Sequence, residues 1–138
     1  MKRALLFAAL AAALVLPLGA SAHGSATLTI RHQLRGCHTW SVNGGAYKAS
    51  QSITLHRGDA LTVIDNDIMP HKLVQVSGPT LRLPASASMH RMGASTRVVF
   101  AKTGVYKFTT KAGEDYAAMA KMKTIGEDNV LKLTVRVS

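Results

Sequence analysis

Short stretches in which apolar and polar residues alternate run through most of this chain, and they constrain its fold more than any other feature. Three of them are "ATLTIRH" (26–32), "HKLVQVSG" (71–78) and "VLKLTVRV" (130–137). Alternation with a period of two is typical of a strand with one buried face. For the last stretch we expect these apolar residues to enter the core: Val130, Leu133, Val135 and Val137.

Turn residues separate these stretches at close intervals. Asn43-Gly44-Gly45 interrupts 39–47 and is a strong hairpin signal. Gly58 and Gly104 likewise divide 52–66 and 96–110, each into two short strands. Several short strands with such spacing predict an all-β sandwich or barrel. Only "GEDYAAMAKMK" (113–123) is helical in character, with acids in its first turn and lysines in its last.

The first 22 residues have the pattern of a secretory signal peptide. Lys2 and Arg3 precede an apolar stretch, and Ala20-Ser21-Ala22 offers small residues for cleavage. Cleavage after Ala22 leaves 138 − 22 = 116 residues, 23–138, which suit one domain. We therefore expect a periplasmic or secreted protein with no transmembrane segment in its mature form.

The chain is strongly basic. It has 17 Lys and Arg against 7 Asp and Glu; without Lys2 and Arg3 the balance is 15 − 7 = +8. Such a charge favours acidic partners: envelope lipids, a polysaccharide, or an acidic redox protein. The cations are scattered and not interleaved with aromatic residues, so we expect no nucleic acid.

One polar stretch raises a question about metal. "DNDIMPH" (65–71) follows a predicted strand and ends on a histidine, so it is either a plain turn or a metal site that begins with His71. "RGCHTW" (35–40) adds a cysteine and a histidine, and "MHRMG" (89–93) adds two methionines and a histidine. Imidazole suits copper, and thiolate or thioether sulfur favours Cu(I).

Two segments resemble the cupredoxins, the family of plastocyanin and azurin. "SITLHRGDALTVIDNDIMPHKLV" (52–74) is similar to their run of strand, Gly-Asp turn, strand, Asn-Asp and Pro-His, and 102–110 resembles a later strand of the family. The resemblance implies a cupredoxin-like Greek-key β-sandwich, with one short helix before the last strand and His71 as the first copper ligand. The chain departs from the family where Thr110 takes the place of the copper cysteine, and no histidine follows His90.

The chain offers a different donor set in place of the usual one. The candidate metal ligands are His71, His38, Cys37, Met69, Met89, His90 and Met92. Neighbours in a strand point to opposite faces, so Cys37 and His38 share a metal only if Gly36 bends the chain. The plainer alternatives are a turn-capping His71, an interior His38 and a buried thiol. The prediction is a pale site that prefers Cu(I), with His71 and His38 as nitrogen donors and one methionine thioether.

These observations predict an exported copper-binding protein that holds or delivers copper or transfers one electron, with an acidic redox or copper-transfer protein as its partner. The alternative is a metal-free, cupredoxin-shaped interaction module of the envelope. A third hypothesis makes His23 the mature N-terminus, where its amine and ring would chelate copper. The chain has no nucleophile elbow, phosphate loop or Cys-x-x-Cys pair, so we expect no enzyme.

Overall fold

The computed structural model of the protein describes residues 24–33, 37–112 and 130–138. These residues form nine strands and one short 3-10 helix. In chain order they are β1 (Ser25–Gln33), β2 (Cys37–Val42), β3 (Ser50–Leu55), β4 (Ala60–Asn66), β5 (His71–Ser77), η1 (Ala85–Ala87), β6 (Ser88–Met89), β7 (Ser95–Val99), β8 (Gly104–Ala112) and β9 (Lys132–Val137).

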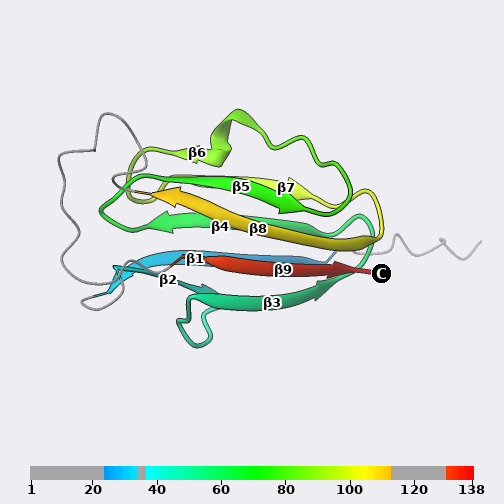
Figure 1. The fold of residues 1–138 in the computed structure, drawn as a ribbon, viewed down its shortest axis with the longest axis horizontal. Coiled ribbons are helices and arrows are strands. Elements are labelled where there is room, and N and C mark those ends of the chain that lie inside the picture. Colours follow the sequence, from blue (N-terminus) through cyan, green and yellow to red (C-terminus); the bar gives the residue numbers. More distant parts are fainter. Residues whose placement is uncertain (1–23, 34–36, 113–129) are drawn as a thin grey trace, which may run out of the picture.

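The strands form two sheets with the orders β2-β1-β4-β7 and β3-β9-β8-β5-β6. Strands β1 and β4 pair in parallel, as do β3 and β9, and the other pairs are antiparallel. In Figure 1 the five-stranded sheet lies in front of the four-stranded one. The expectation of an all-β sandwich is confirmed. The expected helix (113–123) and signal peptide (1–22) lie outside the described residues.

The core lies between the two sheets and includes an aromatic cluster. The ring of Phe100 packs edge-on against that of Tyr106, with centroids 5.0 Å apart, and Trp40 is fully buried. One core prediction was wrong: Val130 is 65% exposed, and Leu131 is buried in its place. Because alternate residues of an extended chain share a face, Leu131, which directly precedes β9, is in phase with the inward residues of that strand, and Val130 is not.

The turn after β2 follows directly from its sequence. Asn43 and Gly44 both have positive φ, 49° and 73°, and the N–H of Gly45 donates to the carbonyl of Val42 at 2.9 Å. Two consecutive positive φ values define a type I′ turn, which Asn-Gly adopts with the least strain.

The strand register gathers several chain segments at one end of the sandwich. The last residue of β1, Gln33, pairs with the first of β2, Cys37, and the end of β4 lies beside β1. In the other sheet His71, which begins β5, pairs with Ala112, which ends β8. These strand ends lie at the left in Figure 1. Among the described residues, no helix has the length and apolar character needed to span a bilayer.

Candidate metal centre

The connection from β4 to β5 is folded by its own carboxylates. Asp65 Oδ1 accepts the N–H of Asp67, and Asp67 Oδ1 accepts the N–H of Met69, each at 3.0 Å. Asp side chains form such bonds with the backbone two residues on. Pro70 disfavours a helical conformation at Met69 and leads the chain into β5. The stretch is therefore a turn, and this turn places His71 fully buried at the start of β5.

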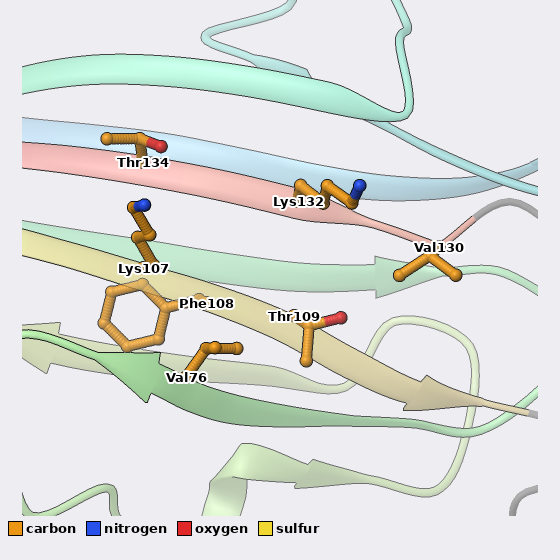
Figure 2. A pocket seen from close by; sticks show the side chains of 7 residues that line it. All are labelled: Val76, Lys107, Phe108, Thr109, Val130, Lys132 and Thr134. Atoms are coloured by element: carbon orange, nitrogen blue, oxygen red, sulfur yellow. The ribbon is translucent and has the colours of Figure 1, made fainter.

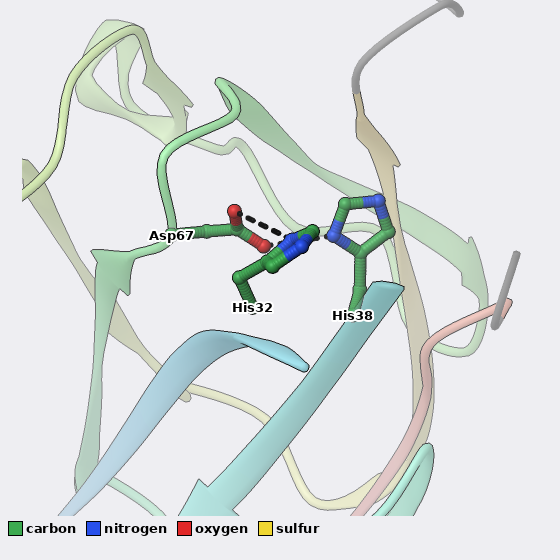
Figure 3. Close-up of side chains that lie close together, drawn as sticks. All are labelled: His32, His38 and Asp67. Carbon is green, nitrogen blue, oxygen red and sulfur yellow. Dashed lines mark hydrogen bonds and ion pairs between the residues drawn. The ribbon is translucent and has the colours of Figure 1, made fainter. Parts of the chain in front are cut away.

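Three imidazole rings converge on the carboxylate of Asp67. Its Oδ2 lies 2.8 Å from Nδ1 of His38 and 3.2 Å from Nε2 of His71. Its Oδ1 lies 3.5 Å from Nδ1 of His32. Figure 3 shows His32, His38 and Asp67 directed toward one another, and their ligand atoms all lie within 4.8 Å of one another. The rings of His38 and His71 meet edge-on with centroids 4.6 Å apart.

Strand pairing explains how His32 and His38 come together. The two residues stand directly opposite each other in the antiparallel pair of β1 and β2. Residues in that relation share a face of the sheet. Asp67 reaches them because β4 runs beside β1 and the turn follows its last residue.

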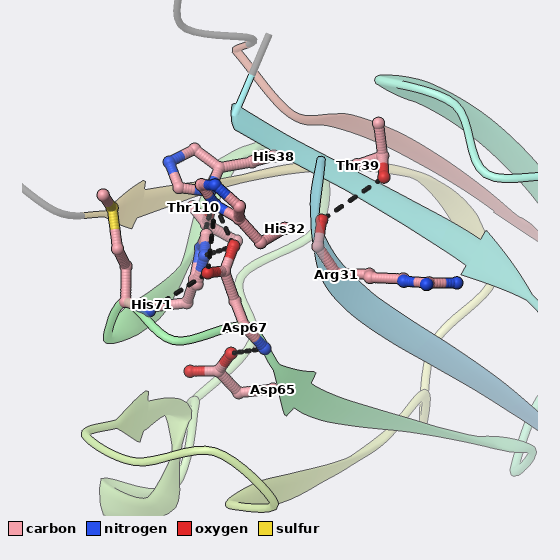
Figure 4. A network of polar contacts seen from close by, with 9 residues as sticks. Arg31, His32, His38, Thr39, Asp65, Asp67, His71 and Thr110 are labelled. Atoms are coloured by element: carbon pink, nitrogen blue, oxygen red, sulfur yellow. Dashed lines mark hydrogen bonds and ion pairs between the residues drawn. The ribbon is translucent and has the colours of Figure 1, made fainter. Parts of the chain in front are cut away.

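The contacts with Asp67 and Thr110 determine which ring nitrogen of His71 carries the proton. Its Oγ1 lies 3.1 Å from Nδ1 of His71, opposite the nitrogen that contacts Asp67 (Figure 4). Because the carboxylate of Asp67 accepts a hydrogen bond from Nε2–H, Nδ1 is the acceptor and the threonine hydroxyl donates to it. The residue at the family's cysteine position is therefore in contact with the first histidine ligand that the family resemblance implies.

Burial and hydrogen bonding oppose each other at Asp67. Burial alone would raise the pKa of the Asp67 carboxyl, but hydrogen bonds from His38, His71 and the N–H of Met69 bring that pKa well below its usual range. Burial lowers the pKa of His71, only partly offset by its bond to Asp67. Asp67 is therefore ionised while His71 is neutral, and a neutral imidazole beside a carboxylate is available to a cation.

The neighbouring carboxyl of Asp65 has the opposite character. Burial raises its pKa to about 7, and the charge of Asp67 adds to the rise, while the N–H groups of Asp67 and His71 counteract it. Its Oδ2 is buried without a hydrogen-bond partner among the described residues. Asp65 thus supports the turn, and Asp67 holds the negative charge.

The donor set fits a divalent copper ion. Nδ1 of His32 is buried and has no hydrogen-bond partner within the described part of the chain, although it is directed at Asp67. An imidazole nitrogen left in this way is ready to bind a cation. Together the site offers three imidazoles and one carboxylate, which are donors that Cu(II) accepts.

The structure separates the residues that the sequence proposed as ligands. His38 and His71 belong to the centre, and Met69 lies buried in the turn beside it. Met89 stands opposite His71 in the pair of β5 and β6 but is part of the hydrophobic core. His90 is exposed, and Met92 is 54% exposed. The side chain of Cys37 and residue His23 lie outside what the structure describes.

Two members of the centre, His32 and Asp67, were not among the predicted ligands. A signal for His32 exists in the sequence, because His32 and His38 are equally spaced about residue 35, as partners across a hairpin are. Asp67 stood within the motif, but its role depends on the contact between β4 and β1, which no local pattern shows.

No protein-family model matches the chain, and no curated protein matches it. Among solved structures, it is similar to a purple cupredoxin from Nitrosopumilus maritimus, with 19% identity, a TM-score of 0.45, and coverage of 81% of this chain and 98% of that one. It is also similar to the 2F4 variant of the multicopper oxidase McoA from Aquifex aeolicus, with 8% identity, a TM-score of 0.48, and coverage of 81% of this chain and 26% of that one. For a multicopper oxidase from Campylobacter jejuni the identity is 13% and the TM-score 0.46, with coverage of 83% and 25%.

The chain thus spans about a quarter of the length of these multicopper oxidases. The described residues form a β-sandwich of two sheets, with His71 at the start of β5. Thr110 stands where the resemblance of the sequence to the cupredoxins places that family's copper cysteine.

Proposed function

We propose that the protein binds one copper ion through His38, His71 and Asp67, with His32 as a fourth donor. The observation that carries this proposal is the convergence of three imidazole nitrogens on one buried, ionised carboxylate. The ionised carboxylate of Asp67, beside the neutral ring of His71, places a buried negative charge at the centre that a cation neutralises.

Each residue has a definite part in binding. Without metal, His38 and His71 both contact Asp67 through ring nitrogens, and these are the nitrogens that would hold the ion. The proton on Nε2 of His71 would then move to Nδ1, which would donate a hydrogen bond to the Thr110 hydroxyl and keep the ring in place. Copper, when bound, supplies a one-electron redox couple.

The role that fits this centre best is copper holding or delivery in the periplasm or outside the cell. The described donors of the centre are nitrogen and oxygen, which favour Cu(II), whereas the sequence predicted a methionine sulfur donor and Cu(I). Electron transfer to an acidic partner is the alternative use of the same centre. A catalytic role is not part of the proposal.

Copper retention tests the proposal. Protein loaded with Cu(II) and dialysed should keep about one equivalent of copper. His71→Ala and His38→Ala should each lose tight binding, because each removes a buried nitrogen donor. His56→Ala is the matched control, since that exposed histidine binds Ser138 at a distant turn. His90→Ala should also keep its copper; loss of copper there would show that the wrong histidines were chosen.

The second candidate function is a metal-free interaction module. It is favoured by the hydrogen bonding at His71, whose two ring nitrogens already contact Asp67 and Thr110. In that case the centre is a structural network that ties the turn to β2 and β8. Wild-type protein that keeps no copper after dialysis would support this function and contradict the proposal.

A further inference from the structure

The outer face of the five-stranded sheet is strongly basic. Five cationic residues at outward positions of three adjacent strands define what we call the basic face: Lys72 on β5, Lys107 and Lys111 on β8, and Lys132 and Arg136 on β9. All five are exposed. The inward residues of these strands, such as Leu73, Tyr106 and Leu133, are buried.

No described acidic side chain offsets this charge. The described part of the chain holds three acids, Asp59, Asp65 and Asp67, and all three are buried. A surface of one sign draws an oppositely charged partner and speeds its association.

One pair on the basic face is unfavourable for the fold itself. Lys72 and Lys111 stand directly opposite each other on β5 and β8. Like charges in that relation destabilise a sheet. A local arrangement that opposes folding without a visible gain within the chain is typical of a functional surface.

An apolar hollow lies within the basic face. Its volume is roughly 400 Å³, and Figure 2 shows its lining: Val76, Lys107, Phe108, Thr109, Val130, Lys132 and Thr134. Val76 and Val130 are 62% and 65% exposed, so apolar surface meets water here. Lys107 and Lys132 place positive charge at the same opening.

We propose that the basic face is a docking surface for an acidic protein that places an apolar side chain in the hollow and carboxylates on the surrounding lysines. Charge complementarity selects an anionic partner. The hollow selects a protein over a lipid surface, because a concave, apolar opening between two cations fits one protruding side chain flanked by acids. An apolar centre with a charged rim is the usual anatomy of such an interface. The proposal does not depend on copper.

Two synthetic peptides test the proposal on the full mature chain. One has a central phenylalanine with three glutamates on each side, and its match has alanine at the centre. In titrations followed by amide NMR, the phenylalanine peptide should shift resonances of β5, β8 and β9 and bind about tenfold more tightly than the alanine peptide. Equal affinity of the two peptides would overturn the role of the hollow.

Charge reversal with a matched control locates the binding. Lys107→Glu/Lys132→Glu should lower the affinity for the phenylalanine peptide by about tenfold or more. Arg97→Glu/Lys102→Glu makes the same change in net charge away from the basic face. It should lower the affinity for the same peptide by less than about threefold. Both variants should keep the dispersed amide spectrum of the folded protein. Equal losses in the two variants would show general attraction without a docking surface.

Vesicles that contain an anionic phospholipid test whether the basic face binds a lipid surface in place of an acidic protein. The proposal expects the peptide to depend on Lys107 and Lys132, with vesicle binding reduced equally by both double variants. If Lys107→Glu/Lys132→Glu abolished vesicle binding selectively while the peptides bound neither form, the basic face would be a lipid-binding surface and the proposal would be wrong.

Discussion

Oδ2 of Asp67 lies 2.8 Å from Nδ1 of His38, and both side chains are almost fully buried. The same oxygen also contacts His71, so one atom joins the turn after β4 to β2 and β5. An ionised oxygen shared by two buried rings is held by charge-assisted hydrogen bonds, which are stronger than neutral ones. Asp67 therefore serves the stability of the metal-free fold as well as the proposed copper site.

Asp67→Asn should lower both stability and copper retention. The variant keeps the shape of the side chain but loses the charge that two imidazoles contact, so the free energy of unfolding should fall by about 2 to 4 kcal/mol. Urea unfolding of the metal-free protein measures this loss. Asp59→Asn is the control, because Asp59 is also buried and accepts backbone N–H groups of Gly24 and His56. It should lose stability and keep copper; equal copper loss in both would make the role of Asp67 purely structural.

The raised pKa of Asp65 predicts a pH-dependent stability of the metal-free protein. Its folded pKa of about 7 exceeds the ordinary Asp pKa of 3.8, so its contribution to stability is fully present below about pH 4 and is lost as the pH rises through 7. Asp65→Asn lacks this titration. The stability of the variant relative to wild type should therefore rise from pH 5 to pH 8, with a slope of at most about 1.4 kcal/mol per pH unit. Parallel stability curves for the two proteins across this range would contradict the assignment.

Alternation and turn residues predicted most of the fold. Stretches 71–78 and 96–110 appear as β5, β7 and β8, and Asn43-Gly44 forms the expected turn. The sequence does not decide which residues before β9 face the core, because Val130 and Leu131 are both apolar and either could be the first inward residue. Packing against the other sheet decides between them, and that information lies outside the strand.

The candidate site was predicted less completely than the fold. His71 followed from its motif and its resemblance to a family, and His38 from its neighbourhood. The carboxylate at their centre, Asp67, is 29 residues from His38 along the chain. Its place depends on the register between β1, β2 and β4, which is a product of folding and has no local signature.

Thr110→Cys should create a coloured copper site at His71. Thr110 Oγ1 lies 3.1 Å from Nδ1 of His71, so a thiol there would offer copper a position between the sulfur and Nδ1, on the side of the ring away from Asp67. A thiolate bound to Cu(II) in a His/Cys site gives the intense absorption of blue copper proteins. We expect a strong visible band in the copper-loaded variant and a pale wild type. Thr110→Ser, with an oxygen at the same place, is the control and should stay pale; a wild type as intensely coloured as the cysteine variant would contradict the prediction.

Gly78 should resist substitution because of backbone conformation and crowding together. Its φ is +111°, and an added Cβ would lie 2.5 Å from the carbonyl oxygen of Val105. Gly93 also has positive φ, +82°, but nothing lies within 4 Å of an added Cβ. Gly93→Ala should cost about 1 kcal/mol of unfolding free energy and Gly78→Ala about 3 kcal/mol or more, as measured by urea unfolding. Equal losses would show that the crowding at Gly78 is relieved by a small backbone shift.

The pair of Lys72 and Lys111 predicts opposite effects on folding and docking. Because the two stand directly opposite in the sheet, Lys72→Glu or Lys111→Glu alone replaces a repulsive pair with an attractive one. Each single variant should raise the free energy of unfolding by about 0.5 kcal/mol, whereas the double variant restores a like-charge pair and should return close to wild type. Salt at 1 M should reduce all three differences in unfolding free energy, since these charges are exposed.

Each single variant should at the same time bind the acidic phenylalanine peptide less tightly, because each removes a cation from the basic face. A gain in stability together with a loss of peptide binding would show that Lys72 and Lys111 oppose folding while serving a partner. Single variants that leave unfolding unchanged and show no coupling in the double variant would remove this pair from the argument for the docking surface.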